Sequence, residues 1–257
     1  MNLDVTQLQA FLAAFLWPFA RVSGLLLTAP VLGASALPVR VRAGLAVILT
    51  LVLMPLAPKS GGVDVMSLNG FATVLQQVVV GAAMGFALAL AFAALTFAGS
   101  LVTNAMGLSF AQVASPLDGH DAPALGELYA LLATLIFLAL DGHLELISLL
   151  ATGMRHASWA APMPGGAHLW QLLQFGAHLF SGAVMVALPA LAALLIADAG
   201  FGVISRAAPA MNLFSIGFPI SIALGFVGVW IGLVTLPGAF ATLRRAAFAL
   251  VRVLAGA

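Results

Sequence analysis

The chain has 257 residues, of which 63% are hydrophobic and only 7% are charged. A soluble globular domain carries roughly 45–50% apolar and about 25% charged residues, so a water-soluble enzyme, a disordered chain and a nucleic-acid-binding protein are excluded. The formal net charge is +1 and there is no cysteine, which leaves no basic stripe, disulfide or thiolate metal site. The composition predicts an integral membrane protein, or part of a membrane assembly that buries nearly all of the chain.

Charge-free apolar runs, separated by clusters of proline and glycine, divide the chain into helices. Crossing the hydrocarbon core takes about 20 apolar residues, and lipid-facing backbone must satisfy its own hydrogen bonds, so such runs predict helices. The expected helices cover residues 5–28, 41–56, 68–103, 124–152, 169–197 and 213–236, followed by a short amphipathic tail at 239–254. The predicted fold class is therefore all-α, a helical integral membrane protein.

The charges fit a simple six-span topology only in part. If the basic tail is cytoplasmic, Arg40, Arg42 and Arg206 fall on the opposite side, against the positive-inside rule. The run 68–103 would also be about 54 Å long at 1.5 Å per residue, which exceeds a core about 30 Å thick. Some helices are therefore expected to be buried against protein instead of spanning lipid.

A few charged residues within the apolar helices are candidates for chemistry. Arg21 lies in the middle of a helix, where insertion at a bilayer centre costs roughly 2.5–3.5 kcal/mol, so it needs a partner. Asp141, Glu145 and Asp198 are the other such charges, and Asp141 and Glu145, four residues apart, would share one helix face. A proton or ion relay is one interpretation. The other is that partner subunits or helix ends satisfy these charges.

The sequence predicts no catalytic, metal or cofactor site. Asp118, His120 and Asp121 cluster in a loop, where a metal site is conceivable but a solvated polar loop is the simpler interpretation. The motif Asp141-Gly142-His143 has acid–base groups, but no nucleophile stands at a telling spacing nearby. An enzyme is therefore not expected.

Small residues recur at the spacing of close helix contacts. Gly81 and Gly85 form one GxxxG pattern, and Gly228 and Gly232 form another. Such faces let membrane helices approach closely, so both pairs predict tight helix packing. The segment 104–121 mixes glycine, proline and Phe110, and it is either a connecting loop or an element that lines or closes a pore.

The order and spacing of several segments resemble the FliR family of flagellar type III export-gate subunits over nearly the whole chain. These segments are RVSGLLLTAPVLG from Arg21, LPVRVRAGLAVILT, VVVGAAMGFAL, FAGSLVTNAMGLSFAQVASPLDG, LIFLALDGHLELI and ADAGFGVISRAAPAMNLFSIGFPISIALG. Two residues depart from the pattern. Gln77 stands where relatives often carry glutamate, and Ser221 stands where many carry lysine, so the charge contacts of relatives do not carry over at these positions.

The resemblance implies a subunit of a protein-export gate that is not an enzyme and has no cofactor. Such subunits assemble with FliP and FliQ into a closed pore in the bacterial inner membrane, at the flagellar basal body, and unfolded substrates pass through it. FlhB docks on that assembly; membrane lipid is a further expected contact, and nucleic acid is not. Much of the assembly stands above the plane that hydropathy assigns to it.

The resemblance also implies a fold of long kinked helices and helical hairpins. A FliP-like part would cover about residues 1–190, and a FliQ-like hairpin with the basic tail would cover about 191–257. The segment 104–121 would act as the pore plug, with Met106, Gly107, Phe110 and Pro116 in it and Phe110 as its apolar stopper. The expected inter-helix or inter-subunit polar contacts are at Arg21, Arg40, Arg42, Asp198, Arg206 and Asn212.

Three alternatives stay open at this point. The injectisome counterpart of the same family would perform the same transport for virulence proteins. A stand-alone secondary transporter or channel would show inverted repeats around a midplane site, and the sequence has no matching halves. An intramembrane enzyme would need a nucleophile or metal constellation.

Overall fold

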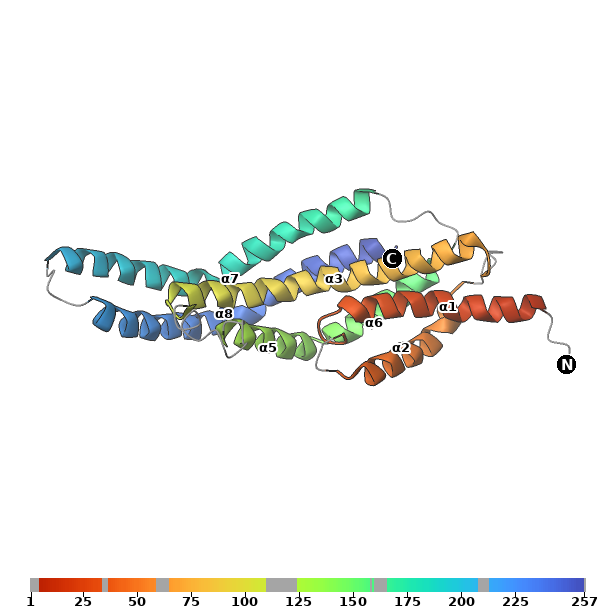
Figure 1. Cartoon of the computed structure of the whole chain (residues 1–257), viewed down its shortest axis with the longest axis horizontal. Helices are drawn as coiled ribbons and strands as arrows, with labels where there is room; N and C mark the ends of the chain where they lie inside the picture. Colours follow the sequence, from red (N-terminus) through yellow and green to blue (C-terminus); the bar gives the residue numbers. More distant parts are fainter. Residues whose placement is uncertain are drawn as a thin grey trace. The chain divides into compact units, whose positions relative to one another are not determined.

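The computed structural model describes residues 5–33, 37–58, 65–109, 124–157, 159, 166–207 and 213–256. In this part of the chain the regular structure is helical and no strand occurs, which confirms the all-α fold class. The elements are α1 (Val5–Thr28), α2 (Val39–Leu53), the 3₁₀ turn η1 (Met54–Leu56), α3 (Leu68–Ala105), α5 (Ala124–Ala139), α6 (Gly142–Arg155), α7 (Gly166–Ala207) and α8 (Leu213–Ala255) (Figure 1).

Five helices are long and apolar enough to cross a membrane, and a sixth crossing is possible if α5 and α6 form one bent span. The expected single helix over 124–152 is wrong, because α5 and α6 meet at 64° around a break at Asp141. Asp141 has a φ of 53°, in the left-handed region, and so cannot continue the helix. The ring of Phe137 lies directly against Gly142, so a side chain at position 142 would collide with it.

Two expected helix ends are also wrong. α7 does not stop near residue 197 but continues to Ala207, and α8 runs to Ala255 without the expected break at Pro237. Glycine and proline are more frequent in membrane helices than in soluble ones, and neighbouring helices and hydroxyl side chains satisfy the backbone that proline leaves free. The tail is therefore the last part of a single 43-residue helix.

The described helices belong to two compact units, which we treat separately. Unit 1 contains α1, α2, η1, α3 up to Leu90, α6, the start of α7 up to Gly176, and α8 from Arg244. Unit 2 contains α3 from Ala91, most of α5, α7 from Ala177, and α8 up to Leu243. These units group residues by compactness alone, so the division near residue 190, which rests on resemblance to other subunits, stays a prediction.

Unit 1 is centred on the contact between α1 and α3. Gly24 of α1 lies against the backbone of Val78, and Gly81 of α3 lies against the carbonyl of Arg21, so the two helix backbones touch. A small aromatic cluster continues this core, in which the rings of Trp17 and Trp159 lie 5.5 Å apart.

In unit 2, α7 and α8 run side by side as a hairpin (Figure 1). Gly228 of α8 lies against Ala190 of α7, and a Cβ at position 228 would come within 2.6 Å of the Ala190 Cα. The ring of Phe92 from α3 meets Phe240 of α8 edge-on at 5.3 Å. These contacts cover one side of the hairpin and leave its outer side exposed.

Candidate functional site

Arg21 lies in α1 and is held by neutral groups from two other helices. Its Nε donates a hydrogen bond to Oε1 of Gln77 on α3 at 2.7 Å, and its Nη1 donates to the carbonyl of Gly153 on α6 at 3.1 Å. The guanidinium carbon lies 5.7 Å from the centre of the Trp159 ring. The residue is only 4% exposed, and no described carboxylate lies within ion-pair distance. Unit 1 therefore holds a buried cation with amide, carbonyl and aromatic partners.

Trp159 extends this contact to the end of the α2–η1 segment and to a second residue of α3. Its indole N–H donates to the carbonyl of Pro58 at 2.9 Å, and its own carbonyl accepts a hydrogen bond from the Thr73 hydroxyl at 3.3 Å. Sequence reasoning found Arg21 but missed these partners, because Gln77 and Gly153 lie 56 and 132 positions away. No local pattern could have paired them.

A second polar contact in unit 1 joins α6 to the end of α8. Nη1 of Arg244 lies 2.5 Å from a carboxylate oxygen of Glu145, and the guanidinium of Arg244 also lies 5.5 Å from the ring centre of Phe248. Asp141 does not share a helix face with Glu145 as expected. It precedes α6, and its carbonyl accepts the Glu145 N–H at 3.1 Å. A relay through these two carboxylates therefore has no support from this geometry.

The described start of the predicted plug lies at the end of α3, in unit 2. Met106 is buried and contacts Gly225 of α8, where an added Cβ would collide with the methionine side chain. Gly107 has a φ of 74°, and its N–H bonds to the carbonyl of Asn104, so it ends the helix in the usual left-handed cap. Phe110 and Pro116 lie outside the described residues, so the plug stays a prediction.

The other predicted polar contacts lie on exposed parts of helices. Arg40 is exposed in the first turn of α2, and Arg42, two residues later, is partly buried. Asp198 and Arg206 are both exposed near the end of α7. Asn212 lies outside the described residues. The contacts of these residues with other subunits remain predictions.

The four glycines singled out by spacing have different surroundings. Gly81 and Gly85 both lie against the backbone of α1, and Gly228 lies against Ala190 of α7. Gly232 has more room, since the nearest atom to an added Cβ is the Tyr129 hydroxyl at 3.9 Å. Three of these positions are therefore places of close backbone approach.

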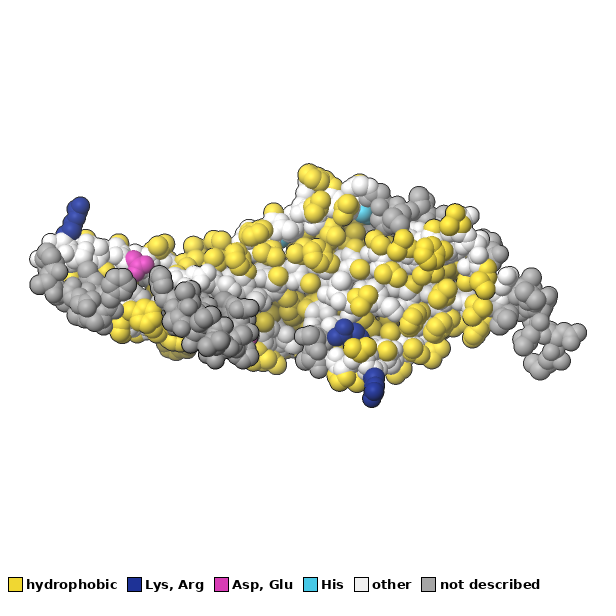
Figure 2. Space-filling model, viewed as in Figure 1, with side chains coloured by type: hydrophobic (Ala, Val, Ile, Leu, Met, Phe, Trp, Pro, Cys, Tyr) yellow, Lys and Arg dark blue, Asp and Glu magenta, His cyan; other side chains and the backbone are white. Residues whose placement is uncertain are grey.

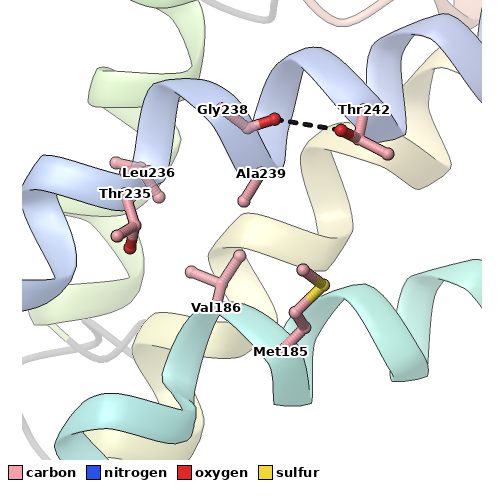
Figure 3. A pocket seen from close by; sticks show the side chains of 7 residues that line it. All are labelled: Met185, Val186, Thr235, Leu236, Gly238, Ala239 and Thr242. Carbon is pink, nitrogen blue, oxygen red and sulfur yellow. Dashed lines mark hydrogen bonds between the residues drawn. The ribbon is translucent and has the colours of Figure 1, made fainter.

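A cavity of about 290 Å³ lies between α7 and α8 within unit 2 (Figure 3). Figure 3 shows its lining, which consists of Met185, Val186, Thr235, Leu236, Gly238, Ala239 and Thr242. The Thr242 hydroxyl donates to the carbonyl of Gly238 at 3.1 Å. None of the lining residues is ionisable, so this cavity holds no acid, base or metal ligand.

Metal ligands do not gather anywhere in the described ranges, where no group of three His, Cys, Asp or Glu side chains occurs. The cluster at Asp118, His120 and Asp121 lies outside those ranges. On the face shown in Figure 2, the described residues carry many hydrophobic side chains and few charged ones. Such a surface suits contacts with lipid or with other apolar helices.

Comparison with known proteins places this chain among bacterial export proteins. The family described as "Bacterial export proteins, family 1" matches residues 12–246. A flagellar biosynthetic protein FliR from Escherichia coli (strain K12) is 36% identical, over 87% of this chain and 86% of its own length. The FliR protein from Pectobacterium carotovorum is 35% identical, over 88% of this chain and 87% of its own length. The FliR protein from Bacillus subtilis is 26% identical, over 83% of this chain and 83% of its own.

Proposed function

The chain belongs to the FliR family of bacterial export proteins, and from this premise we propose that it forms part of a closed pore with FliP-like and FliQ-like subunits. It is a membrane component of the flagellar export apparatus. In the proposal, unfolded flagellar substrates cross the inner membrane through the pore, and a FlhB-like switch protein docks on it. The chain's part is to complete and close the helical assembly, without chemistry of its own.

The match to the family over residues 12–246 carries this proposal, and helix length supports it. α3, α7 and α8 have 38, 42 and 43 residues, or about 57–65 Å at 1.5 Å per residue, against a hydrocarbon core of about 30 Å. In an apolar 18-residue stretch of α7, and likewise of α8, only 33% of the residues are buried. Apolar surface that extends beyond the bilayer is expected to be covered by protein, because its exposure to water is unfavourable.

The relatives also favour the flagellar system over the injectisome, since those from Escherichia coli, Pectobacterium carotovorum and Bacillus subtilis carry the name of a flagellar biosynthetic protein. Within the pore we propose that 104–121 is the plug, with Met106 and Gly107 at its root and with Phe110 and Pro116 further along. Asp198, Arg206 and Asn212 would contact neighbouring subunits. The FliP-like and FliQ-like parts would meet near residue 190.

Native mass spectrometry of the tagged full-length chain, co-expressed with FliP-like and FliQ-like subunits and extracted in mild detergent, tests the assembly. We expect one large species with a single copy of this chain and several copies of each partner. A monomer or homo-oligomer, despite co-expressed partners, would contradict the proposal and move the transporter alternative to first place.

The plug has a separate test in the assembled complex. We expect Phe110→Ala to leak small molecules across the inner membrane while the complex still forms. Wild-type permeability with normal assembly would show that Phe110 is not the stopper, and would leave the assembly proposal intact.

A further inference from the structure

α2 is sparsely covered by the rest of the chain described. Only 17% of the 18 residues in Val39–Leu56 are buried, against 56% in an apolar 18-residue stretch of α3. The buried residues of α2 are Ala46, Thr50 and Leu53, which define the face turned toward the rest of unit 1. The opposite face of α2 carries large apolar side chains that nothing in the described chain covers.

That outer face is continuous and ends in a cation. Arg40, Gly44 and Ile48 follow at intervals of four residues, and Leu51 completes the row one turn later, so all four lie on one side of the helix. Ile48 is 60% exposed and Leu51 is 55% exposed. The outer face of α2 is thus an apolar strip with an exposed arginine at its N-terminal end.

The position of this arginine is unfavourable for the chain alone. The N-terminus of a helix carries a partial positive charge, which favours anions and disfavours cations. Pro38 precedes α2 without a side-chain cap, and none of the residues 39–56 is acidic. Arg40 forms no hydrogen bond or ion pair with another described residue. An anion from outside the described chain would therefore be stabilised at this helix end.

The length of α2 indicates where that anion lies. With η1 it spans 18 residues, or about 27 Å at 1.5 Å per residue, close to a hydrocarbon core of about 30 Å. α3, α7 and α8 are much longer than such a core. If the apolar strip lies in acyl chains, Arg40 reaches the headgroup layer, where the anions are phospholipid phosphates.

We propose that the outer face of α2 is a lipid-binding surface, on which Arg40 and the uncapped helix end hold the headgroup of an anionic phospholipid. The strip formed by Ile48, Leu51 and Val52 lies along its acyl chains. A partner helix is the alternative occupant, and it would match the subunit contact expected at Arg40. We favour lipid because the strip offers a partner no polar group other than the cation at its end. The inference does not depend on which subunits complete the pore.

The headgroup contact is tested by counting bound phosphatidylglycerol with native mass spectrometry on the full-length chain and the subunits that stay bound to it. We expect Arg40→Gln to lower phosphatidylglycerol retention about fivefold, since one arginine near an anionic surface contributes about that factor. Arg40→Lys, which keeps the charge, should retain most of it. The matched control is Arg155→Gln, which removes another exposed arginine, at the C-terminal end of α6 in the same unit. Equal retention by Arg40→Gln and Arg155→Gln would overturn the proposal.

The acyl contact is tested by a single cysteine, which is unique in this chain because the native sequence has none. Ile48→Cys, labelled with a small fluorophore, is placed in nanodiscs of phosphatidylglycerol with brominated acyl chains. We expect the bromine to quench the label in the assembled complex. If the label is quenched in the isolated chain but protected in the complex, a partner helix covers α2 and the lipid proposal is wrong. That result would leave the proposed pore unaffected.

Discussion

Two glycine-rich apolar regions of this chain have opposite surroundings. Where α1 meets α3, in unit 1, Gly81 and Gly85 lie so close to the backbone of the other helix that a Cβ at either position would collide with it. Near the end of α7, in unit 2, an added Cβ at Gly200 or Gly202 would meet no atom within 4 Å. Glycine therefore lies in a close helix contact in the first region, and in the second it has no such contact with the described residues.

The difference shows which contacts the chain completes by itself. The α1–α3 contact buries even a cation, since Arg21 is 4% exposed, whereas Ile196 and Val203 on the last turns of α7 are 75% and 69% exposed. A helix that is apolar on its exposed sides is stable only when lipid or another protein covers it. The end of α7 is therefore the region where the proposed subunit contacts are most needed.

The most direct test of this comparison is to replace one glycine of each region by alanine. We expect Gly81→Ala to destabilise the chain by about 1–3 kcal/mol or more, because the obstacle is the Arg21 carbonyl, which no rotamer change can move. The matched variant Gly200→Ala should be neutral or stabilising by about 0.5–1 kcal/mol, as alanine is the better helix former. Thermal unfolding of the detergent-purified chain measures both. Equal melting temperatures would mean that the helices separate at little cost.

Variants of Arg21 and Gln77 test how much the buried hydrogen bonds stabilise the α1–α3 region of unit 1. We expect Arg21→Met to destabilise unit 1 by about 1–3 kcal/mol, because Oε1 of Gln77 and the carbonyl of Gly153 each lose their donor. Arg21→Lys should recover only part, since an ammonium lacks the planar fork with which the guanidinium reaches both acceptors beside the Trp159 ring. The double variant Arg21→Met/Gln77→Met should be more stable than Arg21→Met, because it removes one orphaned acceptor. A double variant no better than the single one would show that the Gln77 bond contributes little.

Charge reversal near the exposed end of α7 tests the second region of the comparison. We expect Arg206→Glu to leave the melting temperature of the isolated chain unchanged, because Arg206 is exposed. Recovery of the complex with FliP-like and FliQ-like subunits should fall about fivefold to thirtyfold, which corresponds to a loss of one or two kcal/mol. Arg155→Glu, at an exposed helix end of unit 1, is the control. Normal recovery of the complex with Arg206→Glu would exclude a subunit contact there.

Apolar runs predicted the existence of the helices, and the start and end expected for α1 agree with the structure. The errors concern helix ends, where local rules for proline and for turn residues gave the wrong result inside apolar stretches. Proline at 237 was expected to end a helix, yet α8 continues through it, and the chain breaks instead at Asp141, where no proline stands. The pair Asp141-Gly142 is itself a turn signal, but it lies within a long apolar stretch and was outweighed by it.

The polar contacts were the least predictable part. Hydropathy marks Arg21 as a charge that needs a partner, but the partner atoms belong to an amide and to a backbone carbonyl, which carry no distinctive sequence pattern. In the same way, sequence spacing related Glu145 to Asp141, four residues away, whereas its ion-pair partner is Arg244, 99 residues away. Contacts of this range depend on how the helices pack, and no local pattern in the sequence shows that packing.

The Glu145–Arg244 pair gives the smallest expected effect, and one that a change of salt can separate from packing. Its side chains are 37% and 14% exposed, so solvent screens the attraction, and we expect Glu145→Gln to cost about 1 kcal/mol or less. The exchange Glu145→Arg/Arg244→Glu should restore only part of this loss, because it moves the cation away from the ring of Phe248. Melting temperatures at low and high salt measure both terms: the ion-pair part should shrink as salt rises, and the aromatic part should persist. Full recovery in the exchanged variant would mean that Phe248 adds nothing and that charge alone joins α6 to the end of α8.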